Sequence, residues 1–485
     1  LWLVRDRLGK KPLYYAFRNG RLAFASELKA LLADPSIGRD LDHAALGIYL
    51  QCGYVPAPLT IYQSIRKLRP GHEAVYERGS LDVRRYWDPL AFVEQARTVD
   101  DADASEELER RLGLAVSQRQ IADVPLGAFL SGGIDSSLVV AMMREHSSTP
   151  VRTFTIRFDN PQFDEADHAA AVAAHLGTDH HEDVCTSDDA LAVATRVPAM
   201  FDEPFADSSA IPTYLVSRAA RAHVTVALSG DGGDELFFGY PRYNHMASRG
   251  WALALPAPVR QAAAMAVGLF PQRRMQRIAD VLRRDDLDAY ARFMHARSPS
   301  QVLALTGTGP VPAPIYSETM KRLAGQTLVS KAPLLDLVTY LPDDILAKVD
   351  RASMAVSLEV RAPLLDHRVV EFALGLPLSL KRRDGSSKWL LRQLLYKRVP
   401  KALVERPKMG FGVPLADWFR GPLRATMTDY CAADDLQRLG LKPAPVRTLW
   451  ADFLAGRSAR ADLLWQMFVL VAWAREYRPA TALPS

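Results

Sequence analysis

The chain has 485 residues, which is more than one hydrophobic core usually serves, so its length favours two or three domains. Hydrophobic residues make up 48% and charged residues 24%, a composition typical of globular proteins and not of disordered or fibrous ones. The net charge of +5, from 60 basic and 55 acidic side chains, gives no argument for a nucleic-acid partner.

Cysteine spacing and apolar runs bear on the compartment. Cys52, Cys185 and Cys431 lie far apart, without the spacing of a disulfide framework or a zinc site. No apolar run approaches the ~20 residues of a membrane span, and no signal peptide is visible. The sequence therefore predicts a cytoplasmic protein without a membrane partner. Because Leu1 opens a dense apolar stretch, we also expect the chain to begin inside a domain.

The first 88 residues, 1–88, are predicted to be rich in strands. Apolar stretches on both sides of an Asn-Gly turn predict a hairpin over 12–25, and a glycine-containing turn predicts a second hairpin over 73–83. Residues 27–32 have a helical pattern between them. The polar, acidic segment 89–104 contains a proline and is predicted to be a linker.

The segment after the linker predicts an α/β layer with a mostly parallel sheet. A charged helix is expected over 105–118, and apolar strands then alternate with helices. The expected strands cover 124–130, 154–158 and 224–228, with a helix over 164–176. The remainder is predicted to be mainly helical, and Ser386 and Ser387 are expected to cap a helix through 390–395.

The stretch 131–137, Ser-Gly-Gly-Ile-Asp-Ser-Ser, follows the first of these strands. Its glycines allow a tight turn, and Ser136 and Ser137 can cap the next helix, whose first N–H groups form a site for phosphate or pyrophosphate. Asp135 would lie beside those phosphates, where a carboxylate is tolerable chiefly if a magnesium ion joins the two. The alternative is a plain glycine turn with a serine cap.

A second glycine-rich loop, Leu228 to Glu235, follows another strand. Its three acidic side chains would repel one another in a plain turn, whereas a bound cation and a backbone-held anion would make the arrangement favourable. The alternative is a flexible acidic loop. Since ligands collect at the carboxyl ends of parallel strands, the two loops together could hold one magnesium–triphosphate between Asp135 and Asp234.

Three other clusters carry weaker signals. The adjacent histidines in 178–182 project in opposite directions from a strand, which favours a structural role over metal binding. The acidic and serine-containing segment 202–209 fits either a substrate wall or capping. Lys408, in the glycine-containing loop 406–412, is either a solvated surface lysine or an ammonium that covers phosphates during catalysis.

Three segments, 131–137, 228–235 and 359–366, together resemble the glutamine-dependent asparagine synthetases of the type-B, two-domain kind. Residues 5–9 with 12–15, and 26–29, look like the end of the glutaminase domain of that family. The resemblance extends over nearly the whole chain, with its motifs in order.

This resemblance implies the fold class and the domains. It implies an α/β fold with a mostly parallel sheet of the PP-loop ATP pyrophosphatase kind, which is adenine nucleotide alpha hydrolase-like. A β-rich remnant of an Ntn-type glutaminase would precede it. The domains would be residues 1–88 of the glutaminase, the linker 89–104, and an ATP-dependent synthetase domain over 105–485.

It also implies the reaction. A carboxylate, that of aspartate first, would attack the α-phosphate of ATP to give an acyl-adenylate and pyrophosphate, and ammonia drawn from glutamine would then displace AMP. The partners would be these small molecules and Mg2+, with a homodimer as one assembly that the family allows.

The resemblance assigns roles residue by residue. Asp135 and Asp234 match magnesium ligands, and Lys408 matches a mobile-loop lysine. Asp231 stands where many relatives carry a glutamate tied to adenylate formation, and Asp6 matches a residue that holds the amino group of glutamine. The ATP contacts implied are Leu130 and Ile156 at the adenine, Ser131, Gly132, Gly133, Ser136 and Ser137 at the pyrophosphate, and Ser229 and Gly230.

Two departures from the family pattern lead to expectations. Phe238 replaces a usual glycine and is expected to reshape the acyl-substrate pocket. The family's glutaminase uses an N-terminal cysteine, whereas Cys52 is internal, so this chain is expected to use ammonium and not glutamine.

Two other functions stay open from the sequence. One is a different acyl-adenylating enzyme on the same scaffold, such as a β-lactam synthetase-like enzyme or another amidotransferase. The other is a nucleotide-binding regulatory protein without turnover, which the presence of both aspartates and Lys408 disfavours.

Overall fold

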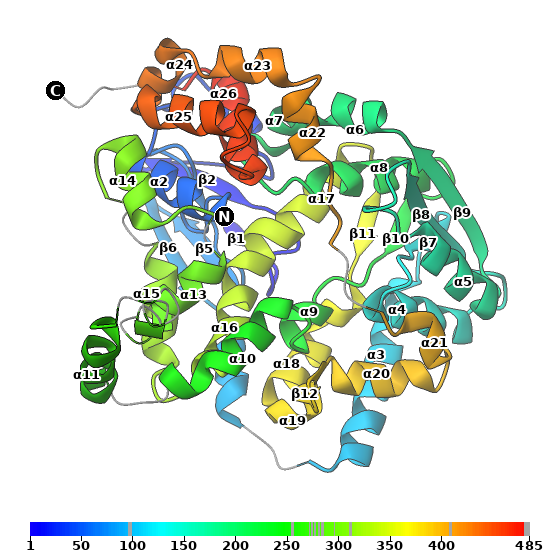
Figure 1. The fold of residues 1–485 in the computed structure, drawn as a ribbon. Coiled ribbons are helices and arrows are strands. Elements are labelled where there is room, and N and C mark those ends of the chain that lie inside the picture. The colour runs from blue at the N-terminus through cyan, green and yellow to red at the C-terminus, as the bar shows by residue number, and fades with distance from the viewer. Residues whose placement is uncertain are drawn as a thin grey trace.

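The computed structural model describes residues 1–479, except 96–98, 254–256, 271, 273–274, 276–277, 280–281, 283–285, 295, 310–312 and 407–409. Figure 1 shows the N-terminal strands in blue beneath the C-terminal helices, with the main sheet at the other side of the molecule.

The N-terminal part contains two small antiparallel sheets. One has the order β1 (Trp2–Val4), β5 (His72–Glu77), β6 (Ser80–Arg85), and the other has the order β3 (Arg21–Ala25), β2 (Tyr14–Arg18), β4 (Arg66–Lys67). Both predicted hairpins are present. Their two-residue turns, Asn19-Gly20 and Arg78-Gly79, have positive φ at both positions, which matches the right-handed twist of the paired strands.

The main sheet has five parallel strands in the order β11-β10-β7-β8-β9, which confirms the predicted fold class. These strands are β7 (Leu126–Phe129), β8 (Arg152–Phe158), β9 (Asp179–Cys185), β10 (Val226–Leu228) and β11 (Glu359–Arg361). From β7 the chain adds β8 and β9 on one side, and it later returns to add β10 and β11 on the other side. The strand order therefore reverses between β7 and β10, which is where open α/β sheets bind ligands.

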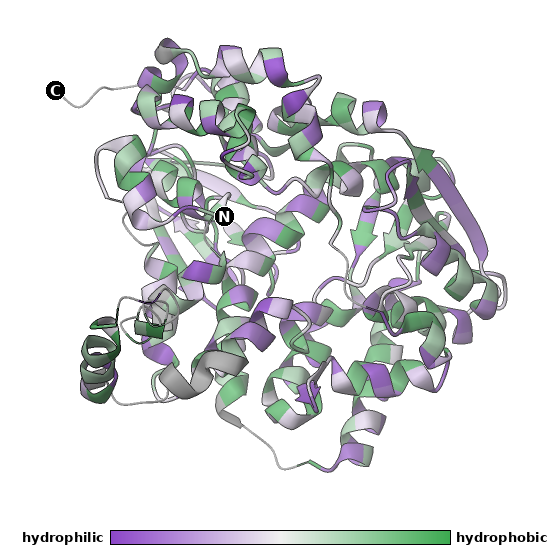
Figure 2. Cartoon of the chain, in the orientation of Figure 1, coloured by the Kyte–Doolittle hydropathy of each residue, from purple (hydrophilic) through white to green (hydrophobic). Residues whose placement is uncertain are grey.

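Burial follows the position of each strand in this sheet. β10 is fully buried, as expected for a central parallel strand, whereas β9 at the edge is largely exposed and charged (Figure 2). His180 and His181 lie on opposite faces of β9. His180 Nδ1 hydrogen-bonds Thr153 Oγ1 at 2.9 Å, and the ring of His181 packs against the rings of both Phe154 and His223. Their contacts fit the predicted structural role.

The helices next to the sheet begin near the predicted positions. The helix expected from 105 is α3 (Asp101–Arg119), which starts earlier because Asp100 accepts hydrogen bonds from the N–H groups of Ala102 and Asp103. The stretch expected to be a linker thus holds the first turn of α3, and also the 3-10 helix η1 (Pro89–Gln95). The other helices against the sheet are α4 (Ile134–Glu145), α5 (Ala166–Leu176), α8 (Ala210–Arg221) and α17 (Leu346–Met354).

The remaining described elements are mainly helical, as predicted. They are α1 (Leu28–Leu32), α2 (His43–Cys52), α6 (Ser187–Ala194), α7 (Val197–Phe201), α9 (Gly233–Leu236), α10 (Pro241–Leu253), α11 (Ala257–Gly268), α13 (Asp286–Met294), α14 (Pro299–Thr306), α15 (Pro314–Arg322), α16 (Leu328–Val338), the π-helix η2 (Leu341–Ile345), the 3-10 helix η3 (Pro363–Leu365), α18 (His367–Gly375), α19 (Leu378–Lys381), the strands β12 (Arg382–Arg383) and β13 (Ser386–Ser387), α20 (Trp389–Tyr396), α21 (Lys401–Val404), α22 (Leu415–Arg420), α23 (Arg424–Tyr430), α24 (Ala433–Arg438), α25 (Pro443–Leu454) and α26 (Ala461–Tyr477).

The two ends of the chain share one core. α2 and α26 belong to the same cluster of buried hydrophobic residues. Tyr49 Oη donates to Gln466 O at 2.8 Å, and Gln466 Nε2 donates back to Tyr49 O at 2.8 Å. Among the described residues, no helix is both long and apolar enough to cross a membrane.

Candidate active site

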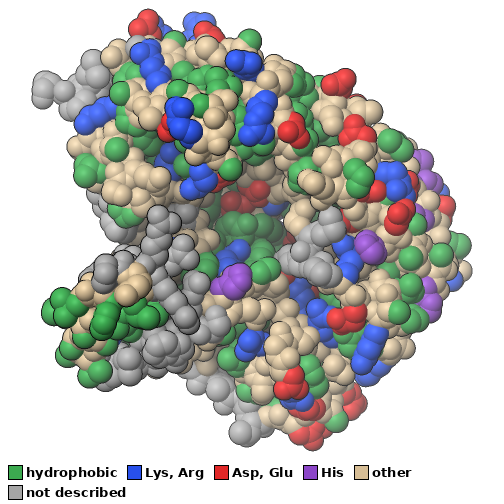
Figure 3. All heavy atoms as spheres, viewed as in Figure 1, with side chains coloured by type: hydrophobic (Ala, Val, Ile, Leu, Met, Phe, Trp, Pro, Cys, Tyr) green, Lys and Arg blue, Asp and Glu red, His purple; other side chains and the backbone are tan. Residues whose placement is uncertain are grey.

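The loops after β7 and β10 meet at the reversal of strand order and line a cleft of about 780 Å³. Figure 3 shows this face of the molecule hollowed at its centre, with charged side chains inside. Most of the ATP-site residues predicted from the sequence line this cleft, namely Leu130, Ser131, Gly133, Asp135, Ser136, Ile156, Ser229, Gly230, Asp231 and Asp234. Gly132 and Ser137 are not among the lining residues: Gly132 packs against the backbone of His168, and Ser137 is fully buried.

The loop 131–137 lies between a strand and a helix, as predicted, but the predicted serine cap is wrong. α4 already begins at Ile134, with Gly133 as N-cap and no side-chain cap, so Ser136 and Ser137 lie inside its first turn. Ser136 Oγ instead accepts from the N–H of Ser131 at 3.2 Å and lies 3.0 Å from Ser131 Oγ. The loop is therefore closed on itself by hydroxyls, and no side-chain cap covers the N-terminus of α4.

The acidic loop (residues 228–235) lies directly against the predicted phosphate loop (residues 131–137). A Cβ on Gly233 would lie 2.4 Å from Asp135 Oδ1, so the contact between the two loops requires glycine. Ser229 Oγ donates to Asp231 Oδ2 at 2.6 Å, while burial raises the pKa of Asp231. Burial, reinforced by the neighbouring Asp234, raises the pKa of Glu235 to about 7. The loop thus concentrates carboxyl groups at one point of the cleft.

Lys388 joins the two loops, and sequence reasoning missed it. Its ammonium bonds the carboxylate of Asp135 and lies 2.7 Å from Asp234 Oδ1. The Lys388 side chain is 8% exposed. Burial acts to lower the pKa of Lys388, but the two carboxylates outweigh it and raise the pKa above its usual value. The structure therefore brings Asp135 and Asp234 together around one cation.

Lys388 occupies the position at which the sequence predicts a serine cap. Ser386 and Ser387 form β13, and the N-cap of α20 is Lys388 itself, in a left-handed conformation with φ 56°. Its N–H donates to Phe237 O at 2.8 Å, which fixes it to the acidic loop. The pattern of apolar residues does not reveal a left-handed conformation at a single position. A lysine that precedes a helix is also usually exposed to solvent, so Lys388 gives no signal in the sequence.

Phe238 also has a left-handed backbone. Its φ is 61°, a left-handed value at the position where the family usually carries glycine. The ring, however, is buried with Tyr243 and Ile48, and it is not among the residues that line the cleft. The ring of Phe238 therefore belongs to the core behind the cleft, and its predicted effect on the acyl-substrate pocket stays a prediction.

The segment 202–209 divides between two places. Asp207 and Ser209 line the cleft, where they accept hydrogen bonds from Lys348 Nζ at 2.7 and 2.8 Å. Burial opposes ionisation of Asp207, but the ammonium of Lys348 outweighs it and lowers the pKa of Asp207 to about 2. Burial, and then repulsion from Asp207, raises the pKa of Asp344 well above its usual value. This wall thus contains a charged pair, and the buried carboxyl group of Asp344, whose ionisation is opposed, lies beside it.

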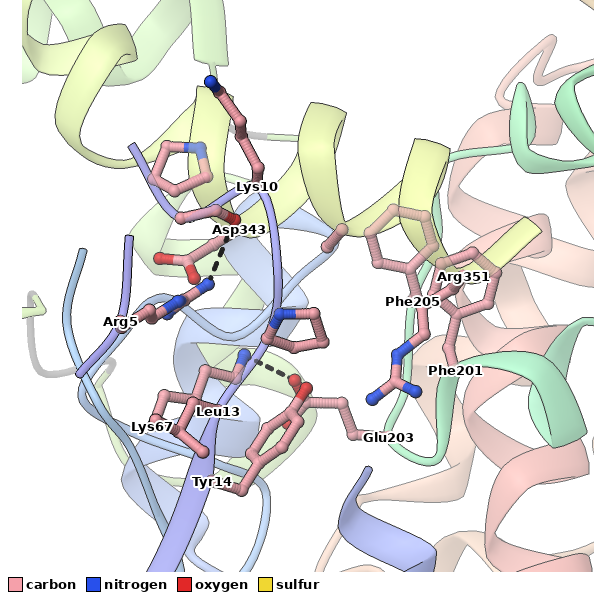
Figure 4. Close-up of a pocket in the computed structure, with 14 residues that line it drawn as sticks. Arg5, Lys10, Leu13, Tyr14, Lys67, Phe201, Glu203, Phe205, Asp343 and Arg351 are labelled. Atoms are coloured by element: carbon pink, nitrogen blue, oxygen red, sulfur yellow. Dashed lines mark hydrogen bonds and ion pairs between the residues drawn. The ribbon is translucent and has the colours of Figure 1, made fainter. Parts of the chain in front are cut away.

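Asp202 and Glu203 lie instead at the seam between the N-terminal part and the rest of the chain. Glu203 forms a buried ion pair with Lys67, and both line a cavity of about 30 Å³ (Figure 4). Arg351 donates to Ser26 O at 2.9 Å and lies 3.8 Å from Asp202 Oδ2. The seam is therefore closed by buried charge pairs.

The basic loop 406–412 is described only in part. Arg406 donates to Ser131 O at 3.0 Å and forms an ion pair with Glu165 at 2.8 Å, so its guanidinium holds the phosphate loop. Lys408 lies outside the described residues, and its predicted role stays a prediction.

Asp6 organises a loop in the N-terminal part. Its carboxylate accepts from the N–H groups of Leu8, Lys10 and Lys11, each at 3.1 Å. Its predicted contact with glutamine stays a prediction.

The donors at the cleft suit a hard cation. Asp135 and Asp234 offer carboxylate oxygens, which Mg2+ prefers, and phosphate oxygens usually complete such sites. A Cβ on Gly239 would lie 1.9 Å from Asp234 Oδ1 and 2.1 Å from Lys388 Cε, so the backbone leaves this space to the charged groups. Among the described residues, no three His, Cys, Asp or Glu side chains form a metal site of their own. The residues thus fit a magnesium ion held jointly with a bound polyphosphate.

Family comparison agrees with this geometry. The model of the asparagine synthase family matches residues 107–475, which include both loops, Lys348 and Lys388. The chain belongs to the asparagine synthase family. The model of the glutamine amidotransferase domain matches residues 1–87.

Several relatives in the asparagine synthase family align with most of this chain. It is 35% identical to "Putative asparagine synthetase (glutamine-hydrolyzing)" of Mycobacterium tuberculosis strain H37Rv, over 98% of this chain and 74% of that protein. It is 30% identical to "Asparagine synthetase (glutamine-hydrolyzing) 1" of Bacillus subtilis, over 98% and 75%. It is 26% identical to "Amidase chyE" of Penicillium rubens, over 90% and 71%. The family assignment makes the chain an enzyme of the ligase class.

Proposed function

We propose that the enzyme forms an amide from a carboxylic acid, with aspartate as the first candidate, at the expense of ATP cleaved to AMP and pyrophosphate. The observation that carries this proposal is the meeting of Asp135 and Asp234, from two neighbouring strand ends, beside the start of α4. Buried carboxylates need a cation nearby. The site therefore fits a magnesium-bound pyrophosphate better than it fits a loop that binds no ligand.

The roles of the residues follow from their positions. The N–H groups at the start of α4, with Ser131 and Ser136, would bind the phosphates that leave as pyrophosphate. The N–H of Leu130 already donates to Phe154 O at 3.0 Å, so Leu130 would meet the adenine through its carbonyl. Asp135 and Asp234 would hold Mg2+, which neutralises the phosphate charge when bound.

The acid would lie on the other side of the α-phosphate, where its carboxylate attacks. Asp231 and Lys348 both line the cleft, Asp231 from the acidic loop and Lys348 from α17, and we assign them to this side. A fixed ammonium beside developing negative charge stabilises the transition state. We assign ammonia, supplied as such or from glutamine through the N-terminal part, as the nucleophile that then displaces AMP.

Exchange of labelled pyrophosphate into ATP tests the proposal. We expect exchange that depends on aspartate and Mg2+, a loss of at least 100-fold in Asp234→Asn, and no loss in the control Asp183→Asn, whose side chain is exposed on β9. Mass identification of the product with ammonium across a panel of acids names the substrate. Exchange with another acid alone would replace aspartate, whereas unchanged exchange in Asp234→Asn would refute the site.

A further inference from the structure

The carboxylate pair of the cleft carries its own counterion. Asp135 and Asp234 are only 16% and 19% exposed, and both contact the ammonium of Lys388. Two carboxylates so close together would repel each other in a poorly solvated place, and the lysine offsets this repulsion. The pair therefore has a cation in the absence of any metal.

Lys388 is held in place from both sides. Its N–H donates to Phe237 O at 2.8 Å, and its carbonyl accepts from the N–H of Arg392 at 2.9 Å. A left-handed conformation is unfavourable for a residue with a Cβ, so the contacts around Lys388 must stabilise it. An incidental surface contact would not need this backbone geometry.

A divalent ion and this ammonium cannot both bind the pair without repelling each other. We propose that Lys388 competes with Mg2+ for Asp135 and Asp234, so that the free enzyme binds the metal weakly and acquires it only with the polyphosphate. The negative charge of the polyphosphate gives the ammonium another partner and leaves the carboxylates to the metal. The inference rests on the proposed function for the assignment of the pair to magnesium.

Binding of Mn2+, followed by its electron paramagnetic resonance, tests the competition without turnover. Without nucleotide, we expect Lys388→Met to bind Mn2+ at least 10-fold more tightly than the unmodified enzyme, and Lys388→Arg to stay weak because it keeps the charge. Lys381→Met, which removes another buried lysine, is the matched control and should leave Mn2+ binding unchanged. If Lys388 only supported the fold, its replacement by Met would not tighten the binding of Mn2+.

Nucleotide completes the test. A non-hydrolysable ATP analogue should tighten Mn2+ binding at least 10-fold in the unmodified enzyme and much less in Lys388→Met. The double variant Asp234→Asn with Lys388→Met should lose the tight binding, which locates the ion at the pair. Lys388→Gln serves as the second neutral variant if Lys388→Met does not fold.

The outcomes separate the two proposals. Equal Mn2+ affinity of Lys388→Met and the unmodified enzyme without nucleotide overturns the competition, whatever the exchange assay gives. Absence of Mn2+ binding even with the analogue overturns the magnesium assignment and the competition together. Linked binding of Mn2+ and nucleotide without exchange for any acid supports the competition and refutes the proposed reaction.

Discussion

Two residues with positive φ shape the acidic end of the cleft. Phe238 and Lys388 both have left-handed backbones, and the hydrogen bond from Lys388 to Phe237 O links them. Backbone strain of this kind is retained where a site needs it. At Lys388 the strain places a cation between two carboxylates, and at Phe238 it turns an aromatic ring into the core.

The strain at Phe238 can be measured with two truncations. Phe238→Gly and Phe238→Ala both lose the buried ring, but only alanine must adopt the left-handed conformation, at about 1–2 kcal/mol. Glycine gains about 0.4–1 kcal/mol of extra entropy in the unfolded chain, which is the smaller effect. We therefore expect Phe238→Gly to be more stable than Phe238→Ala by roughly 1 kcal/mol in urea unfolding. A higher midpoint for Phe238→Ala than for Phe238→Gly would mean that the backbone at 238 is unstrained.

Sequence reasoning located the two loops that meet in the cleft, but it did not identify the left-handed backbone of Lys388 or Phe238. The glycine and aspartate runs mark loops after strands, so their place at the strand ends follows from topology. Lys388 comes from a part of the chain more than 150 residues beyond the acidic loop. Its contacts depend on how that part packs, which no local pattern contains.

At the scale of elements, the helix boundaries show which signals were reliable. The Asp100 cap was overlooked, and α3 therefore starts earlier than its apolar stripe suggests. The predicted serine caps are wrong, because Ser136 hydrogen-bonds Ser131 and because Ser386 and Ser387 form β13. A serine favours a cap only when no other partner lies within reach.

The short helix α19 ends on a buried lysine. Burial alone lowers the pKa of Lys381 to about 8, from 10.5. Between these pH values the folded chain binds fewer protons than the unfolded chain, so stability rises with pH there, and the full cost is present below pH 8. The difference corresponds to about 3 kcal/mol.

Replacement of this lysine should therefore stabilise the enzyme at neutral pH. We expect Lys381→Met to raise the free energy of unfolding by about 2–3 kcal/mol at pH 7, and the gain to shrink as the pH approaches 10.5. Denaturant unfolding at several pH values measures it. The control Lys321→Met, at an exposed position, should show no such trend. A gain that is independent of pH would refute the charge argument.

At the scale of the whole molecule, the N-terminal part and the synthetase part are joined by buried charge. Lys67 and Glu203 pair across the seam, and Lys67 also donates to Val55 O. Burial acts to lower the pKa of Lys67, but Glu203 and Asp343 together with Tyr14 outweigh it and raise the pKa. Loss of one partner would leave the other charge buried without its counterion.

The two partners should therefore be strongly coupled. We expect Lys67→Met to cost about 3–5 kcal/mol of stability, and Lys67→Met combined with Glu203→Gln to recover most of this loss. Urea unfolding of the single and double variants completes the cycle. Additive losses would show that the pair contributes only through packing.

The shared core of α2 and α26 has a consequence for the order in which the protein can fold. α26 is the last described helix, yet Gln466 satisfies the backbone of α2 near the start of the chain. During synthesis, the face of α2 that packs against α26 must stay open until α26 has left the ribosome. Until α26 is made, this face is exposed to misassembly, and a chaperone that covers it would act before α26 is available.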